Sequence, residues 1–328
     1  MLTTPLAASA IGLGFASQTL LRPPMAPHRQ DVLDALMAPP PDAVSGRGGV
    51  RSLSSPSVPS GGSTADPGAL RARRLPEASS GRPMGGGESS GPTLNLEIRV
   101  ALLKLSPQPT VGGEGGWRVV SRDGQVLRQG GAGEVGNASD LLGSLDEVWV
   151  EANGAGNLRA DGRPYAGRFR VLRAANGIQL VNHLPLESYI SSVVGGEMPS
   201  SWRIEALRAQ AVAARSYAMA HMARPASEHW HLGDTTRWQN YEGLNTVSEP
   251  TLQATHSTAG VILSYQGGIV ESLYAATQQI VDEAHSHLGA SMSQTGAQEL
   301  AEQGMRFSEI LAHYYQGASL ARLQIGAS

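Results

Sequence analysis

Glu197 is the residue whose chemistry this sequence indicates most directly, because it follows two glycines and precedes an alanine-rich stretch. The segment reads Val194-Gly195-Gly196-Glu197-Met198-Pro199. One carboxylic acid among apolar neighbours can serve as a general acid or base, for example on a glycosidic oxygen. Ordinary glycoside hydrolysis uses two carboxylates, and the next acid along the chain is Glu205. The sequence therefore favours single-carboxylate chemistry at Glu197, with a helix-capping or merely exposed carboxylate as the alternative.

Composition excludes several other chemistries. The chain has no cysteine, which removes disulfides, thiolate catalysis and cysteine zinc sites. Lys104 is the single lysine, so a Schiff-base mechanism lacks a plausible candidate. His285 and His287 lie near Asp282 and Glu283, but this spacing favours a surface loop over a metal site. No phosphate-binding loop is present, and the net charge of −3 gives no drive toward nucleic acid. We predict no cofactor, no metal and no nucleic-acid partner.

The first third of the chain has the composition of a leader and a tether. Residues 1–22 are apolar and rich in small residues but lack a basic start, so they form a weak export signal. A disordered apolar leader is the alternative. Residues 23–93 are rich in proline, glycine and serine, which predicts a disordered low-complexity linker. No later segment reaches the roughly 18 consecutive apolar residues of a membrane helix.

Residues 94–185 carry the pattern of a mostly antiparallel sheet. Alternating apolar residues and turn signals such as Asp123-Gly124, Asp161-Gly162 and Asn176-Gly177 predict short strands joined by hairpins. The expected strands are Leu96–Leu102, Trp117–Val120, Glu147–Glu151, Arg168–Leu172 and Ile178–Val181.

Residues 186–325 are predicted to mix helices with strands around Glu197. A short helix is expected over Ser188–Val194, and a longer one is expected to begin between Pro199 and Trp202 and to end before Pro225. The alanines of the longer helix allow another element to approach closely. Strands are expected at Gly260–Tyr265 and Ile269–Tyr274, and helices at Ser293–Gln303 and Ser308–Tyr315. The whole pattern predicts an α+β fold: a sheet module, then a mixed domain, behind a disordered tether.

The segment around Glu197 resembles the signature of the SpoIID/LytB family of bacterial cell-wall proteins. The resemblance is carried by Glu197-Met198-Pro199 with the helix over Ala206–Ala218, and by the lead-in from Val181 to Tyr189. It continues through Asp234-Thr235-Thr236 and Leu273-Tyr274-Ala275 to a last set of residues from Met292 to Gly317. The family's better known members are lytic transglycosylases. The resemblance therefore implies Glu197 as the acid and base that cleaves the bond between N-acetylmuramic acid and N-acetylglucosamine.

The resemblance also implies a set of sugar-contacting residues, each with a structural alternative. Asp234 and the threonines after it commonly cap turns, Ser293 suits a helix N-cap, and an arginine in an alanine helix is usually solvated or ion-paired. The implied set is Asp234, Thr235, Thr236, Gln239, Tyr241, Ser293, Gln294 and Arg215.

Two functions from different classes follow from the resemblance. The first is an exported, extracytoplasmic lytic transglycosylase that acts on peptidoglycan glycan strands, expected to be stripped of peptides. The second is a non-catalytic protein that binds wall glycan and enhances a cell-wall amidase. The stretch between Tyr274 and Met292 is shorter than in the family, which favours the second, whereas the intact Glu197 segment favours the first. A degenerate domain with neither activity is a third reading.

Overall fold

The computed structural model describes residues 71–74, 96–175, 177–278 and 291–324. The chain divides into two units, residues 1–62 and residues 63–328, and all of the described residues belong to the second unit. This unit combines several sheets with helices, which confirms the predicted α+β class. The predicted leader, and the predicted tether apart from residues 71–74, lie outside the described residues.

A seven-stranded sheet, in the order β12-β2-β11-β10-β7-β4-β5, forms the first part of this unit. Neighbouring strands are antiparallel except β12, which pairs parallel to β2. The five predicted strands are all present, and glycines with positive φ occupy the predicted turns at Gly124, Gly162 and Gly177. The strands are β2 (Glu97–Ala101), β4 (Trp117–Val120), β5 (Val126–Gly130), β7 (Glu147–Ala152), β10 (Arg168–Ala174), β11 (Gly177–Pro185) and β12 (Leu232–Gly233).

A second sheet in the same region, in the order β6-β3-β8-β9, is not predicted by the sequence patterns. Its strands are three or four residues long. This is too short for an alternation of apolar and polar residues to be recognised in the sequence. They are β3 (Thr110–Gly113), β6 (Val135–Asn137), β8 (Leu158–Ala160) and β9 (Arg163–Tyr165). Helix α2 (Ala138–Leu142) follows β6, and the Asn137 side chain caps it by accepting a hydrogen bond from the Ser139 amide.

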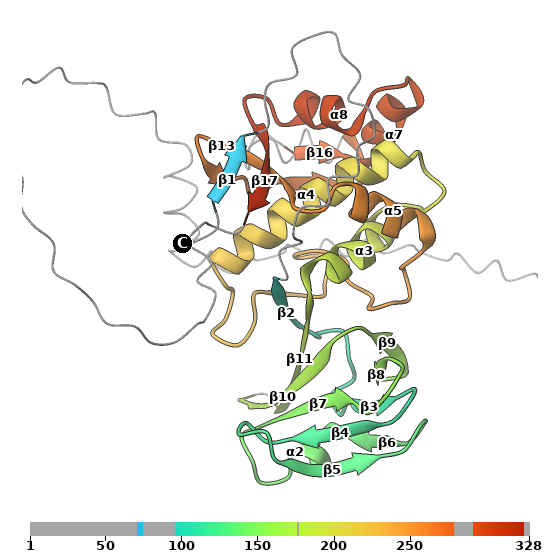
Figure 1. The fold of residues 1–328 in the computed structure, drawn as a ribbon, viewed down its shortest axis with the longest axis vertical. Coiled ribbons are helices and arrows are strands. Elements are labelled where there is room, and N and C mark those ends of the chain that lie inside the picture. The colour runs from blue at the N-terminus through green and yellow to red at the C-terminus, as the bar shows by residue number, and fades with distance from the viewer. Residues whose placement is uncertain (1–70, 75–95, 176, 279–290, 325–328) are drawn as a thin grey trace, which may run out of the picture. The chain divides into compact units, whose positions relative to one another are not determined.

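Two helices connect the sheet to the rest of the unit. Helix α3 (Leu186–Glu197) begins directly after β11, and helix α4 (Ile204–Ala223) follows it. Helix α4 contacts α3, α5, α7 and α8, and it lies among them in Figure 1. Most of its side chains are buried, including the alanines at 206, 209, 211, 213, 214, 218 and 220. The predicted close approach of other elements to this helix is thus present.

The remaining elements complete a four-stranded sheet, in the order β1-β17-β13-β14, and a short parallel pair, β15-β16. The predicted strand Ile269–Tyr274 is two strands instead, β14 (Gly268–Ile269) and β15 (Leu273–Ala275). Strand β1 (Arg71–Arg74) lies within the predicted linker, so the linker prediction is wrong for these four residues, which pair with β17. The other elements are α5 (Glu249–Ser257), β13 (Val261–Tyr265), β16 (Ser291–Ser293), α7 (Gln294–Glu302), α8 (Phe307–Tyr314) and β17 (Ser319–Gln324).

One hydrophobic cluster runs through both predicted modules. It includes Phe169 and Leu184 from the sheet, Ile190 from α3 and Val212 from α4, all nearly inaccessible to solvent. The predicted module boundary between residues 185 and 186 therefore falls between two elements that share one core. Within the described ranges, no helix has the length and apolar character needed to cross a membrane.

Candidate functional site

Glu197 is the last residue of α3, and α4 begins only at Ile204. The expected helix start between Pro199 and Trp202 is therefore wrong. Residues 199–202 form a turn instead, in which the Trp202 amide donates to the Pro199 carbonyl at 3.0 Å. Glu197 thus lies at the carboxyl end of one helix and is separated by a turn from the positive end of the next. A helix N-terminus would stabilise its anion, and this position does not provide one.

The half-buried carboxylate of Glu197 is held by two segments that are distant in the sequence. The backbone amide of Asn240 donates to Oε1 at 2.8 Å, and the Gln294 side chain donates to Oε2 through Nε2 at 3.1 Å. Both donors are neutral. A carboxylate has about four lone-pair sites, so each oxygen keeps a site for proton exchange with a ligand. Gln294, which the family resemblance implies as a sugar contact, thus lies beside Glu197 in this structure.

The two glycines before Glu197 allow the 240–246 loop to pack against the last turn of α3. A Cβ atom on Gly195 would lie 1.9 Å from the Thr246 carbonyl oxygen, and one on Gly196 would lie 2.4 Å from the Asn240 carbonyl oxygen. The Asn240 side chain also donates to the Gly196 carbonyl at 2.8 Å. The Gly-Gly-Glu motif is thus explained by the close approach of this loop, which brings the Asn240 amide to Glu197.

Gln239 lies at the centre of a buried hydrogen-bond network next to Glu197. Its Oε1 accepts from the Tyr189 hydroxyl at 2.9 Å, and its Nε2 donates to the Tyr274 hydroxyl at 2.9 Å and the Ala214 carbonyl at 3.1 Å. Burial, followed by the negative charge of Glu197, raises the pKa of Tyr274 well above its ordinary value. The tyrosines therefore stay neutral, and the structure gives Gln239 a supporting position beneath the site.

Tyr241 is also buried. Its hydroxyl donates to Asn182 Oδ1 at 2.7 Å, and its ring packs against Tyr189 with centroids 5.1 Å apart. Ser293 is fully buried and caps α7, because its Oγ accepts from the Gly296 amide at 3.0 Å. The structural alternative that the sequence left open for Ser293 is the one observed.

Asp234 is fully buried at the end of β12. Its carboxylate accepts from the backbone amides of Leu103 at 2.9 Å and Lys104 at 3.4 Å. Burial raises the pKa of the Asp234 carboxyl above its usual value. Asp234 therefore fixes the chain after β2 in this structure. Thr235 is half-buried and Thr236 is exposed, so these two keep surface that a ligand can reach.

Arg215 is a buried structural residue in this structure and has no exposed side-chain area. It forms a two-pronged ion pair with Glu187, in which Nε lies 2.9 Å from Oε1 and Nη2 lies 2.7 Å from Oε2. Its guanidinium also donates to the Val261 carbonyl at 3.1 Å. The ion-paired alternative is the one observed, because the fork of donors is used to join α3, α4 and β13.

Sequence reasoning missed Asn240 and assigned no role to Lys104. Asn240 lies between two predicted site residues, Gln239 and Tyr241, so the predicted Asp-Thr stretch includes the loop that contacts Glu197. Lys104 follows β2, and its Nζ lies 2.7 Å from Asn240 Oδ1 and 2.7 Å from Glu242 Oε1. Contacts between segments 136 residues apart leave no local signal in the sequence.

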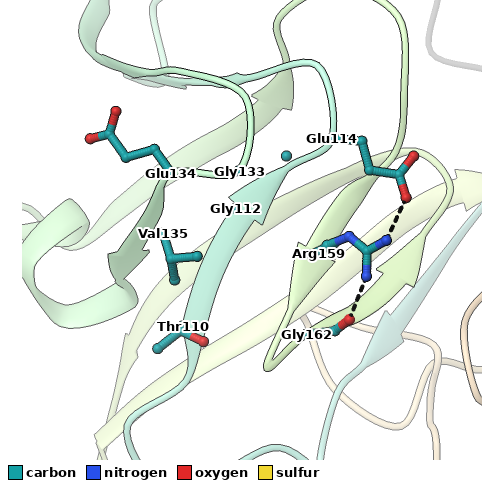
Figure 2. Close-up of a pocket in the computed structure, with 9 residues that line it drawn as sticks. Thr110, Gly112, Glu114, Gly133, Glu134, Val135, Arg159 and Gly162 are labelled. Carbon is teal, nitrogen blue, oxygen red and sulfur yellow. Dashed lines mark hydrogen bonds and ion pairs between the residues drawn. The ribbon is translucent and has the colours of Figure 1, made fainter.

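No group of three or more possible metal ligands occurs among the described residues. The histidines considered for metal binding, His285 and His287, lie outside those residues. A cavity of about 260 Å³ lies in the sheet that contains β3, and Figure 2 shows Glu114 and Arg159 paired at its side. None of the predicted site residues lines this cavity.

Comparisons with known proteins address the segment that contains Glu197. The family model of SpoIID, stage II sporulation protein, matches residues 174–265. Over this stretch the chain is similar to the SpoIID family. The matched stretch runs from the end of β10 to β13 and includes every predicted site residue except Ser293 and Gln294.

Three curated proteins are similar to this chain over 102–122 residues. An uncharacterised protein of Brachyspira hyodysenteriae is 33% identical over 117 residues, which is 35% of this chain and 32% of that protein. The amidase enhancer of Bacillus subtilis is 33% identical over 102 residues, covering 31% of this chain and 14% of the enhancer. Stage II sporulation protein D of Bacillus subtilis is 33% identical over 122 residues, covering 33% and 35%. The chain thus spans about a third or less of the length of these relatives.

Proposed function

We propose that this chain is a peptidoglycan lytic transglycosylase that cleaves glycan strands of the bacterial cell wall, with Glu197 as its general acid and base. The observation that carries the proposal is the half-buried Glu197 carboxylate, which accepts from one neutral donor on each oxygen. Its position inside the SpoIID segment supports the same assignment.

The reaction needs one carboxyl group. Protonated Glu197 gives its proton to the oxygen that bridges N-acetylmuramic acid and N-acetylglucosamine while the bond from that oxygen to C1 breaks. The 6-hydroxyl of the same muramic acid then bonds to C1, and its proton returns to Glu197. No water is consumed, and the product carries a 1,6-anhydro end.

The surroundings of Glu205 agree with a single-acid mechanism. Glu205 Oε1 lies 2.5 Å from Arg208 Nη1, and Oε2 accepts from the Phe307 amide at 2.8 Å. Oε1 is therefore paired within α4, and Oε2 links α4 to α8. The next carboxylate along the chain does not act as the partner that hydrolytic glycosidases require.

An amidase enhancer is the second candidate, and a specific observation favours it. Several residues predicted to contact sugar, including Asp234, Gln239 and Arg215, are buried and bonded internally. Fewer polar side chains are then left to orient a substrate. The similarity to the amidase enhancer of Bacillus subtilis points the same way. Under either function the partner is wall glycan, so the proposed location is extracytoplasmic.

Digestion of purified glycan strands tests the proposal. The full chain is incubated with peptide-free strands, and the products are searched by mass spectrometry for 1,6-anhydro ends. A transglycosylase produces them. An enhancer produces none but accelerates peptide release by an added amidase. A chain that does neither, and that stays in the supernatant when insoluble peptidoglycan is pelleted, would remove wall glycan as the partner.

A further inference from the structure

We propose that Lys104 is a positioning residue for the Glu197 carboxylate and that it acts through Asn240. The geometry is independent of any activity, while its kinetic consequence rests on the proposed function. Lys104 comes from the sheet module, and Glu197 comes from α3, so the proposal makes the sheet module part of the site.

The ammonium of Lys104 is fully engaged by acceptors from one loop. Its Nζ lies 2.7 Å from Asn240 Oδ1, 2.7 Å from Glu242 Oε1 and 3.5 Å from the Tyr241 carbonyl oxygen. An ammonium has three protons to donate, which equals the number of these acceptors. Its side chain is 22% exposed, so these charge-assisted bonds are partly shielded from water.

Asn240 links Lys104 to Glu197 through its two other polar contacts. Its backbone amide donates to Glu197 Oε1 at 2.8 Å, and its Nδ2 donates to the Gly196 carbonyl at 2.8 Å. One orientation of the side-chain amide lets Oδ1 accept from Lys104 while Nδ2 donates to the Gly196 carbonyl. The same residue therefore fixes the last turn of α3 and one oxygen of the carboxylate.

Asp234 holds the backbone from which Lys104 extends. The buried Asp234 carboxylate accepts from the Leu103 and Lys104 amides, and the Asp234 amide donates to the Ala101 carbonyl at 3.1 Å. These bonds fix the chain directly after β2, so Lys104 reaches Asn240 from a rigid base. This gives the buried Asp234 a connection to the site without a contact to sugar.

Arg163 provides a matched control for the role of Lys104. Both residues pair with Glu242, because Arg163 Nη1 lies 2.8 Å from Glu242 Oε2. Lys104 also contacts Asn240, whereas Arg163 Nη1 is bonded to Glu242. If the ion pair with Glu242 merely stabilises the loop, loss of either cation has the same effect. If Lys104 acts through Asn240, only its loss disturbs the Glu197 site.

The experiment compares the full chain with Lys104→Met and Arg163→Met, all labelled with ¹⁵N-asparagine. The Asn240 amide signal is assigned by its loss in Asn240→Asp. We expect this signal to shift in Lys104→Met and to stay in place in Arg163→Met. On glycan strands we expect kcat to fall roughly 10- to 100-fold in Lys104→Met with KM nearly unchanged, because the acid is misplaced while the sugar contacts remain.

Two results would overturn the proposal: an unmoved Asn240 signal in Lys104→Met, or equal shifts in the two variants. If Lys104→Met does not fold, the same spectrum is recorded for folded wild type after acetylation, since Lys104 is the single lysine. If wild type makes no anhydro ends, the proposed function fails, and the amide signal still decides the role of Lys104.

Discussion

Arg215 in helix α4 shows how a charged side chain is stabilised away from water. The guanidinium of Arg215 is completely buried, and its two bonds to Glu187 and its bonds to backbone carbonyls satisfy its donors. Removing one partner of such a pair leaves the other charge uncompensated, which is more costly than the pair itself is worth.

We therefore expect Arg215→Met to lower the free energy of unfolding by about 3 kcal/mol, measured by urea unfolding of the full chain. Arg208→Met is the control, because its pair with Glu205 is partly exposed and should contribute at most about 1 kcal/mol. If Arg215→Met were as stable as wild type but bound glycan poorly, Arg215 would be a substrate contact and its structural assignment would fail.

His231 makes the stability of the protein depend on pH. Burial, and then the positive charge of Arg99, lower the pKa of His231 to about 3 from an ordinary value of 6.5. The unfolded chain therefore binds this proton first as the pH falls. The contribution of neutral His231 to the free energy of unfolding is fully present above about pH 6.5. It is lost as the pH falls toward 3, by at most about 1.4 kcal/mol per pH unit for one proton.

Urea unfolding between about pH 7 and about pH 5 tests this dependence, because carboxylates contribute mainly below that range. We expect His231→Asn to lose less stability over the interval than wild type does. Burial also lowers the pKa of His183, so part of the dependence should remain in the variant. An equal slope in the two proteins would show that His231 does not carry the effect.

Among the elements, the last turn of α3 is unusual because it requires glycine. In most helices Gly→Ala is stabilising by up to about 1 kcal/mol, since alanine has the better helix propensity. At Gly196 the new Cβ would meet the Asn240 carbonyl oxygen at 2.4 Å, a contact that forces the loop to move. The expected sign of the substitution is thus reversed.

We predict that Gly196→Ala lowers stability by about 1–3 kcal/mol and reduces the formation of anhydro ends more than it reduces glycan binding. Thermal unfolding and a pelleting assay measure the two effects. A variant that is more stable than wild type and equally active would contradict the close approach of the loop to α3.

The elements also show which parts of the fold could be predicted. Alternation and turn residues located β2, β4, β7, β10 and β11, because each strand carries its own signal. The start of α4 was misplaced, since Pro199 favours a helix N-terminus locally but lies in a turn here.

The roles of Asp234 and Arg215 could not be read from sequence, because a polar residue that satisfies buried partners has the same local pattern as one that faces a ligand. The family resemblance names Glu197 and Gln294 as candidates, whereas the contact of Lys104 with Asn240 is visible only in the folded structure.

At the scale of the whole molecule, β1 joins the N-terminal part of the second unit to the last strand. Residues 71–74 pair antiparallel with β17 over four positions. Without β1, the edge of β17 would be open to pairing with other chains. The compact unit that begins at Ser63 should therefore be the smallest well-behaved fragment.

Two truncated chains test this boundary, one beginning at Ser63 and one at Leu94. We expect the shorter chain to unfold at lower urea concentration and to aggregate more readily. The measurements are urea unfolding and light scattering. Equal stability and solubility of the two fragments would show that β1 contributes nothing, and the tether would then extend to Leu94, as composition alone predicts.

The central claim, that Glu197 is the acid and base of glycan cleavage, is tested most directly by the rate at which Glu197→Gln forms 1,6-anhydro ends. Glutamine keeps the size of the side chain but cannot deliver a proton. We expect the rate to fall by about 10²–10⁴-fold while pelleting with peptidoglycan stays unchanged, and we expect Glu205→Gln to retain activity. Anhydro ends formed by Glu197→Gln at the wild-type rate would contradict the account and make Glu197 a structural residue.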